Sequence, residues 1–175
     1  SKGSVVLRTE MMELIQYSPT TDEVYEIPQL TIPPQINKMY INDLSPEKSV
    51  VKYQVDNGIQ TFVISWKNPS KDQGHWDMAD YVNSCREAME AVAAITKSDK
   101  VNVSAGCSGG QTAAMLASTA NAGYRDNALT NVTLLSVIFG TVRNVFERNL
   151  STSERADIRA QLVVMCAAYL EASMH

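Results

Sequence analysis

A strand that passes within a few residues into a helix is the feature that most constrains the fold of this chain. The segment Val-Asn-Val at 101–103 predicts a strand, small residues cluster at 105–110, and the alanine-rich segment 111–122 predicts a helix. Cys107 lies at the apex of this turn. A sheet whose strands alternate with helices contains connections of this kind.

The rest of the chain also alternates between strand-like and helix-like segments. Short apolar runs predict further strands at 5–7, 29–32, 61–66 and 132–137. The run at 61–66 is continuous, which is typical of a strand covered on both faces. Helical spacing predicts helices over 11–17 and 77–96, and another that starts with Ser45 as N-cap and Pro46 at its first position and ends before Gly58. The order favours a parallel α/β sheet with right-handed crossovers.

Composition excludes several classes of function. The chain has 175 residues, 45% of them hydrophobic, so a single domain with a sizeable core is expected. The net charge is −4 and no basic block carries interleaved aromatic residues, which argues against a nucleic-acid partner. No apolar run is long enough to span a bilayer, and no signal peptide is found. Cys85, Cys107 and Cys166 have no paired spacing, so we expect thiols in the cytoplasm and no zinc site.

The turn around Cys107 has the residue types of a nucleophile elbow, the strand–turn–helix motif of α/β-hydrolases. The positions two before and two after the nucleophile must be small, and Ala105 and Gly109 meet this need, although glycine is commoner at the first. A helix N-terminus favours the thiolate, which is the attacking form of cysteine. The alternative interpretation of the glycine cluster is an anion-binding turn or a plain tight turn.

The same motif predicts an oxyanion hole, a pair of N–H groups that stabilise the oxygen of the attacked carbonyl. The N–H of Ser108 would supply one half, and Gln35 or Ile36, in the loop after strand 29–32, would supply the other. The remaining cysteines, Cys85 and Cys166, fall on apolar helix faces and are expected to be inert core residues.

Five separated stretches of the chain resemble polyhydroxyalkanoate synthases, which join hydroxyacyl units from coenzyme A thioesters into storage polyester. They are 10–17, 32–38, 43–49, 65–69 and 106–110, and their order and spacing match as well. The resemblance covers about 5–137 and leans toward the class II, medium-chain-length synthases through Ser-Pro-Glu-Lys-Ser at 45–49.

The resemblance implies a covalent mechanism. Cys107 would attack an (R)-3-hydroxyacyl-CoA, release coenzyme A and hold the growing polyester chain, with general-base help from a histidine that an aspartate assists. It implies no cofactor and no metal, because the coenzyme A thioester is the substrate. It also implies a homodimer and contact with the surface of the polymer granule in the cytoplasm.

The chain departs from the family after its nucleophile. In this fold the acid and the histidine follow the nucleophile. His75 precedes Cys107 and is expected on a surface loop, and His175 is the last residue. Asp126 and Asp157 follow Cys107 without the family context. No residue is therefore assigned as the catalytic histidine or aspartate.

These observations define the predicted organisation. Residues 1–139 are expected to form a partial α/β-hydrolase-like catalytic core, a parallel sheet flanked by helices. Residues 140–175 do not resemble the family, and an apolar stripe after the capping box at 151–154 predicts a long closing helix. The predicted function is an acyltransferase that polymerises (R)-3-hydroxyacyl-CoA and is incomplete in this chain. The alternatives are a non-catalytic synthase relative that acts as an interaction or granule-associated module, and an ordinary thiol esterase or lipase relative, against which the family stretches outside the elbow argue.

Overall fold

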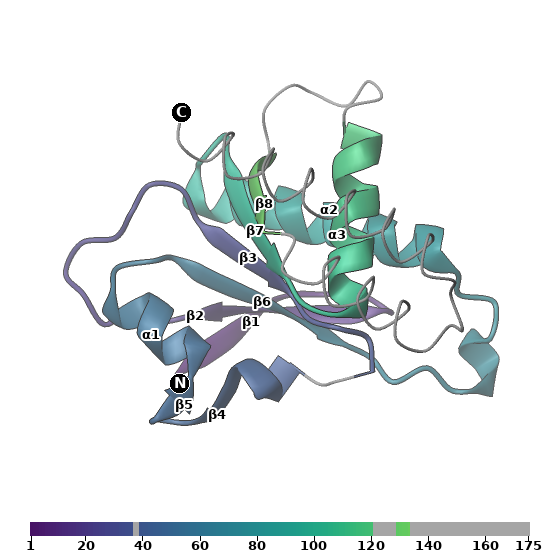
Figure 1. Cartoon of the computed structure of the whole chain (residues 1–175), viewed down its shortest axis with the longest axis horizontal. Coiled ribbons are helices and arrows are strands. Elements are labelled where there is room, and N and C mark those ends of the chain that lie inside the picture. The colour runs from purple at the N-terminus through teal and green to yellow at the C-terminus, as the bar shows by residue number, and fades with distance from the viewer. Residues whose placement is uncertain (37–38, 121–128, 134–175) are drawn as a thin grey trace, which may run out of the picture. The chain divides into compact units, whose positions relative to one another are not determined.

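The described residues form a six-stranded sheet flanked by helices (Figure 1). The computed structural model describes residues 1–36, 39–120 and 129–133, and the structural statements below concern these residues. The sheet has the order β1-β2-β6-β3-β7-β8. Its strands are β1 (Gly3–Arg8), β2 (Met12–Tyr17), β3 (Gln29–Ile32), β6 (Thr61–Trp66), β7 (Val101–Ala105) and β8 (Leu129–Thr133). The helices are α1 (Val50–Asp56), α2 (Met78–Thr96) and α3 (Ser108–Ala120), with short 3-10 turns η1 (Met39–Asn42) and η2 (Lys71–Gln73).

The four strands β6, β3, β7 and β8 run parallel, as the sequence predicts. A helix lies between each of these strands and the next along the chain: α1 follows β3, α2 follows β6, and α3 follows β7. Parallel neighbours need such crossover connections, whereas antiparallel strands can be joined by a tight turn. The β1–β2 hairpin is antiparallel and pairs with the edge of β6 through β2, so the complete sheet is mixed.

The predicted helix over residues 11–17 is wrong, because this segment is strand β2. Met12 and Leu14 belong to one core cluster, whereas Tyr17 belongs to the other and Ile15 packs against it. This distribution of side chains to opposite faces is the period of a strand. A short apolar segment fits both helical and strand spacing. Here the neighbouring strands decide, since β2 pairs with β1 on one side and with β6 on the other.

The helix start predicted at Ser45 and Pro46 is also wrong. A small hairpin, β4 (Asp43–Ser45) with β5 (Lys48–Ser49), occupies this segment, and its turn contains Pro46. Proline suits such a turn because its fixed φ matches the second turn position. Helix α1 begins one residue after Ser49, whose hydroxyl oxygen accepts a hydrogen bond of 2.7 Å from the Lys52 N–H.

The other predicted elements agree more closely with the structure. Gly58 has φ 74° and follows Asn57, the C-cap of α1, which confirms its predicted place. Helix α2 begins after its N-cap Asp77, whose carboxylate accepts hydrogen bonds from the N–H groups of Ala79 and Asp80. Strand β8 begins earlier than predicted, at Leu129, and residues 134–137 of the predicted strand lie outside the described residues. The predicted closing helix within 140–175 lies outside them as well.

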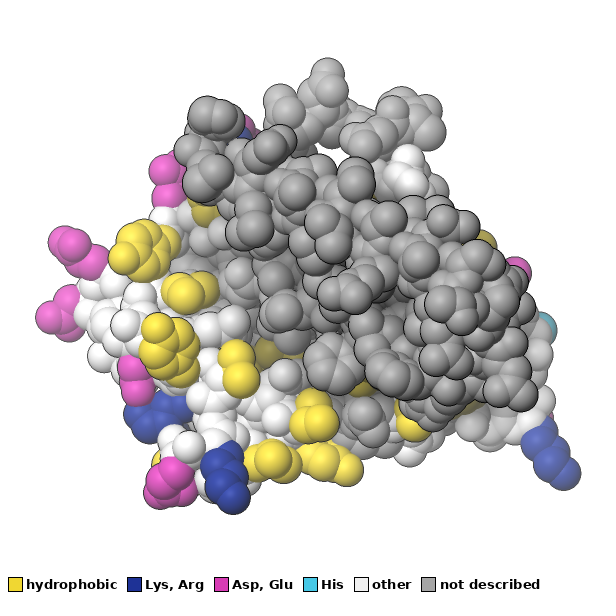
Figure 2. Space-filling view, viewed as in Figure 1, with side chains coloured by type: hydrophobic (Ala, Val, Ile, Leu, Met, Phe, Trp, Pro, Cys, Tyr) yellow, Lys and Arg dark blue, Asp and Glu magenta, His cyan; other side chains and the backbone are white. Residues whose placement is uncertain are grey.

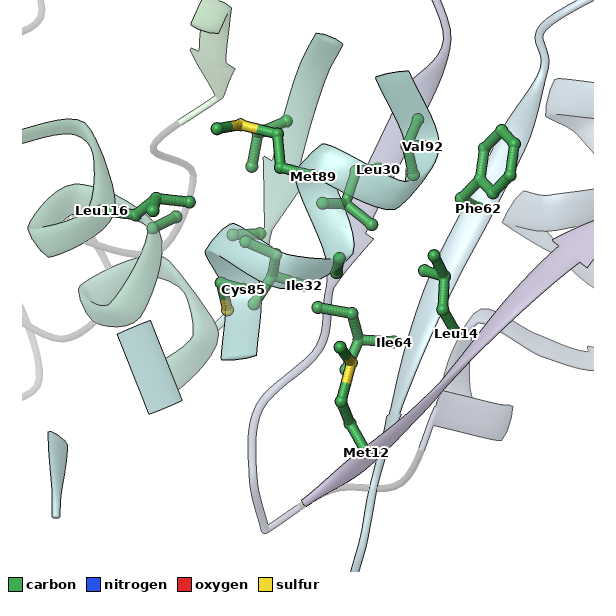
Figure 3. Packing of buried hydrophobic residues seen from close by; sticks show 14 of the residues in the cluster. Met12, Leu14, Leu30, Ile32, Phe62, Ile64, Cys85, Met89, Val92 and Leu116 are labelled. Carbon is green, nitrogen blue, oxygen red and sulfur yellow. The ribbon is translucent and has the colours of Figure 1, made fainter. Parts of the chain in front are cut away.

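The core is divided between the two faces of the sheet. The larger cluster joins the sheet to α2 and α3, and Figure 3 shows part of it: Met12, Leu14, Leu30, Ile32, Phe62, Ile64, Cys85, Met89, Val92 and Leu116. The smaller cluster packs Val51 and Val55 of α1 against Tyr17 and Val63. Consecutive residues of β6 thus enter different clusters, which confirms that this strand is covered on both faces. None of the helices in the described part of the chain is both long enough and apolar enough to cross a membrane.

Strand β2 provides a test of this arrangement. Leu14 is 0% exposed, so Leu14→Ala should lower the free energy of unfolding by about 2–5 kcal/mol through lost burial and the cavity that remains. Val5 in β1 is 44% exposed, and Val5→Ala should cost about 1 kcal/mol or less. Urea denaturation followed by circular dichroism measures both. Equal effects of the two substitutions would contradict the placement of β2 inside the sheet.

Candidate functional site

Cys107 occupies a sharp bend between β7 and α3. Its φ is 55°, in the left-handed region that residues with a Cβ rarely adopt. Among the described residues other than glycine, Lys97 is the second with positive φ, and it is the C-cap of α2, where this conformation is common. At Cys107 the strand ends at Ala105 and the helix begins at Ser108, so the chain turns within two residues. The strand–turn–helix geometry predicted for this segment is therefore present.

The two described cysteines have different surroundings. Cys107 is exposed, whereas Cys85 lies on the buried face of α2 in the core, and neither forms a disulfide. Burial raises the pKa of the Cys85 thiol to about 12, because the apolar core disfavours the charged thiolate. The prediction that Cys85 is a core residue is confirmed. Cys166 lies outside the described residues.

The first turn of α3 lies directly against the end of β3. A Cβ built on Gly109 would lie 2.7 Å from the carbonyl oxygen and 2.9 Å from the carbonyl carbon of Pro33, and closer still to the carbonyl oxygen of Ile32. Real side chains do not come this close to backbone atoms, so only glycine fits. At Gly106, by contrast, a Cβ would have no other atom within 4 Å. The small-residue requirement at position 109 thus comes from the neighbouring strand end.

Hydrogen bonds also connect the loop after β3 with the first turn of α3. The N–H of Gln35 donates to Ser108 Oγ at 3.3 Å, and the Ser108 hydroxyl donates to Gln35 Oε1 at 2.5 Å. Gln35 Nε2 donates to Thr112 Oγ1 at 2.9 Å. The Thr112 hydroxyl donates a hydrogen bond to the Ser108 carbonyl oxygen at 3.2 Å. One glutamine side chain thereby spans two positions of α3.

The start of this loop is fixed from the other side by Trp66. The Trp66 indole N–H donates to the Pro33 carbonyl oxygen at 2.8 Å, and this bond is buried. Trp66 also packs edge-on against Tyr81 of α2, with 5.2 Å between ring centroids. The strand end is consequently held by β6 and by α2 as well as by α3.

The structure brings two of the predicted oxyanion-hole residues into contact. Gln35 and Ser108 are 73 residues apart in the chain, yet they are joined by two hydrogen bonds. Because the Gln35 N–H already donates to Ser108 Oγ, Ile36 is the remaining candidate from this loop. The side chain of Ile36 is 86% exposed. The assignment of an oxyanion hole to Ser108 with Gln35 or Ile36 stays a prediction.

Thr112 and Trp66 were not predicted as parts of the site. Thr112 stands four residues after Ser108, and this spacing puts both residues on one face of a helix. The sequence could therefore have indicated that Thr112 lies beside Ser108. Trp66 carried no such signal, since its contact with Pro33 joins two strands that are distant in the sequence.

His75 lies on the surface, as predicted. It is exposed in the segment between η2 and α2, its Nδ1 is 3.1 Å from the carbonyl oxygen of Asp72, and its ring stands edge-on to Trp76. His175, Asp126 and Asp157 lie outside the described residues. Within the part of the chain that the structure describes, no three His, Cys, Asp or Glu side chains are grouped so that they could hold a metal ion.

Comparison with known proteins agrees with the resemblance seen in the sequence. Residues 1–54 match the family described as the N-terminus of poly-beta-hydroxybutyrate polymerase (PhaC). The chain is 43% identical over 166 residues to poly(3-hydroxyalkanoate) polymerase 1 of Ectopseudomonas oleovorans, a match that covers 91% of this chain and 30% of the relative. It is 37% identical over 139 residues to the PhaC polymerase subunit of Cupriavidus necator, covering 79% of this chain and 23% of that subunit.

A solved structure agrees with the fold. An α/β serine hydrolase without a lid from Xanthomonas campestris superposes with a TM-score of 0.51 at 12% identity, covering 69% of this chain and 58% of the hydrolase. The α/β-hydrolase-like fold class predicted from the sequence is thereby confirmed. The similarity to polyhydroxyalkanoate synthases is confirmed as well, and the chain spans about 30% of the length of the first of these polymerases.

The contact between α3 and β3 predicts a difference between two glycines. Gly109→Ala would force the helix away from the Pro33 carbonyl, and such overpacking should cost about 1–3 kcal/mol of stability. Gly106→Ala meets open space at a residue without positive φ, and its effect should be within about 1 kcal/mol. Thermal unfolding of both variants makes the comparison, and an equal loss in the two would show that α3 does not approach β3 as described.

The different surroundings of the two thiols predict selective alkylation. With a pKa of about 12, Cys85 has roughly one thiolate in 10,000 at about pH 8, and its sulfur is shielded by the core. Iodoacetamide should therefore modify Cys107 in the folded chain while Cys85 stays unmodified until denaturant is added. Mass spectrometry of the cysteine-containing peptides gives both rates. Equal modification of Cys85 and Cys107 in the folded chain would contradict the site.

Proposed function

We propose, on the premise of its similarity to poly(3-hydroxyalkanoate) polymerases, that this chain is the nucleophile-bearing part of an acyltransferase that polymerises (R)-3-hydroxyacyl-CoA, with Cys107 as the nucleophile. One observation carries the proposal: an exposed cysteine with φ 55° stands in a strand-to-helix turn, in a chain 43% identical to such a polymerase. A nucleophile elbow places its reactive atom in this way at the carboxyl end of a sheet strand.

The proposed step is the transfer of an acyl group between two sulfur atoms. The Cys107 thiolate forms a bond to the acyl carbon, and the bond between that carbon and the coenzyme A sulfur breaks. Coenzyme A leaves as a thiolate and takes up a proton, which balances the proton that Cys107 gave up. Because one thioester replaces another, the exchange is close to isoenergetic, so the step requires no cofactor and no metal.

Stabilisation of the developing oxyanion would come from two backbone N–H groups. Ser108 is the first residue of α3, where N–H groups have no partner within the helix. The second group would be that of Ile36, since the Gln35 N–H donates to Ser108 Oγ. Two preorganised donors of this kind lower the barrier of acyl transfer because they face the charge as it forms.

The chain supplies only part of the catalytic machinery in this proposal. The general base would be a histidine assisted by an aspartate, and the described histidine, His75, has its polar contact with Asp72 in its own segment. The chain spans about 30% of the first relative, so we propose that these groups belong to the part of the enzyme that this chain does not match. We also propose, from the same similarity, a homodimer in the cytoplasm that contacts the polymer granule.

A second candidate function is a non-catalytic module that pairs with a complete synthase or binds a granule surface. Exposed hydrophobic side chains favour it, and Figure 2 shows such side chains over the region where α1, β4 and β5 lie. Five large side chains of this region are between 49% and 67% exposed: Tyr40, Ile41, Leu44, Val50 and Tyr53. Apolar clusters on a surface commonly mark sites of interaction.

An assay of coenzyme A release separates the two candidates. The chain, incubated with an (R)-3-hydroxyacyl-CoA, should release coenzyme A and gain the mass of one acyl group on the peptide that contains Cys107. The nucleophile is lost in Cys107→Ala, which should do neither, whereas Cys85→Ala should behave like the unchanged chain. Without a base in place we expect a single acylation, not continued polymerisation. Absence of acylation would leave the interaction module as the better explanation.

A further inference from the structure

We propose that the side chain of Gln35 is a positioning residue that holds the loop after β3 and the first turn of α3 at the spacing that acyl transfer requires. This inference rests on the proposed function, because it concerns the two chain segments that would provide the oxyanion hole. Gln35 would act through its amide group and not through contact with the substrate.

The hydrogen bonds of Gln35 form a closed set. Its N–H and its Oε1 both bond Ser108 Oγ, at 3.3 Å and 2.5 Å, and its Nε2 donates to Thr112 Oγ1 at 2.9 Å. The Thr112 hydroxyl in turn lies 3.2 Å from the Ser108 carbonyl oxygen. Thr112 is 0% exposed, so its hydroxyl cannot exchange these partners for bulk water. These contacts are half-buried, and because the buried Thr112 hydroxyl joins two of them they favour one geometry.

Beyond Pro33, whose carbonyl oxygen accepts the Trp66 indole N–H, the described polar contacts of this loop are those of Gln35. Pro33 and Pro34 have no N–H to donate, so Gln35 is the first residue after β3 whose main chain can donate a hydrogen bond. The next residue, Ile36, has a side chain that is 86% exposed and therefore gains little from packing. The side-chain amide of Gln35, together with its main-chain N–H, therefore sets the position of Ile36 relative to Ser108.

The proposal makes a distinction between two reactions of the same thiol. Acylation of Cys107 by an activated ester passes through a tetrahedral intermediate with a negative oxygen, and needs the two N–H groups in place. The sulfur forms a bond to the acyl carbon, the bond to the phenolic oxygen breaks, and 4-nitrophenolate leaves with the electron pair. Alkylation by iodoacetamide displaces iodide at a saturated carbon and makes no use of an oxyanion hole. Loss of positioning should therefore slow acylation and not alkylation.

The experiment uses the full 175-residue chain with 4-nitrophenyl acetate and iodoacetamide as probes. Gln35→Leu removes the amide, Thr112→Val removes one hydroxyl with little change of volume, and Thr112→Ser restores that hydroxyl. Gln29→Leu in β3 is the matched control, because its amide makes only a 3.4 Å contact with the carbonyl oxygen of the adjacent Leu30. Peptide mass spectrometry assigns each rate to Cys107, and circular dichroism compares the folded content of all variants.

The ratio of the acylation rate to the alkylation rate of Cys107 tests whether Gln35 has the positioning role. This ratio should fall at least about tenfold in Gln35→Leu, and by a smaller factor in Thr112→Val. A displacement of about 1 Å can cost roughly a hundredfold in rate, so a loss of this size is reasonable. Thr112→Ser and Gln29→Leu should keep the ratio of the unchanged chain. Rates that fall together in Gln35→Leu, or a ratio that does not change, would overturn the proposal. A ratio in the unchanged chain no higher than that of a small free thiol would overturn it too, since no positioned hole would then exist.

This result is separate from the test of the proposed function. A chain whose ratio depends on Gln35 but which fails to accept a hydroxyacyl-CoA keeps the positioning role and loses the proposed substrate. A chain that accepts the hydroxyacyl-CoA with a ratio that Gln35→Leu leaves unchanged keeps the function and loses the positioning role.

Discussion

The close contact between the first turn of α3 and the end of β3 is the constraint on which the rest of the site depends. Gly109 lies so near the Pro33 carbonyl that a single added methyl group would not fit. The same carbonyl accepts the indole N–H of Trp66 from the neighbouring strand β6. The end of β3 is thereby held from two sides, and the loop that follows it starts from a fixed point.

The backbone strain at Cys107 persists because the elements around it are rigid. A residue with a Cβ in the left-handed region costs of the order of 1–3 kcal/mol, which the surrounding structure must supply. Strand β7 is paired on both sides, with β3 and β8, and α3 buries Ala113 and Leu116 in the larger core cluster. Neither element can rotate to relax the bend without losing these contacts. The exposed thiol is therefore presented by rigid elements, which suits a reactive group that must meet a substrate in one geometry.

Hydrogen bonds connect the same elements that the apolar core packs together. Gln35 connects the loop after β3 with Ser108 and Thr112 of α3, so the two segments share hydrogen bonds as well as backbone packing. In our proposal these segments provide the two donors of an oxyanion hole, and the general base belongs to the part of the relatives that this chain does not match. On that proposal, the elements that preform the nucleophile and its hole do not include the base.

Much of the framework was predictable because it depends on local patterns. The run at 61–66, the helix that Asp77 caps and the small residues around Cys107 all specify their structure within a few neighbours. The prediction for segment 11–17 was wrong because its five apolar residues fit either period, and pairing with β6 decided between helix and strand. The helix start predicted at Ser45 was wrong for a similar reason, because Ser45 belongs to the β4–β5 hairpin and Ser49 is the N-cap of α1.

The sequence by itself therefore determined an α/β sheet and a cysteine at a sharp strand-to-helix turn, because both follow from the spacing of neighbouring residues. Only the tertiary structure decided why position 109 must be glycine, and which side chains surround the turn. Ser108 meets Gln35 across 73 residues of chain, and Gly109 meets Pro33 across a similar distance. Contacts of this range depend on how strands are ordered in the sheet, and the pattern of a single sequence does not contain that order.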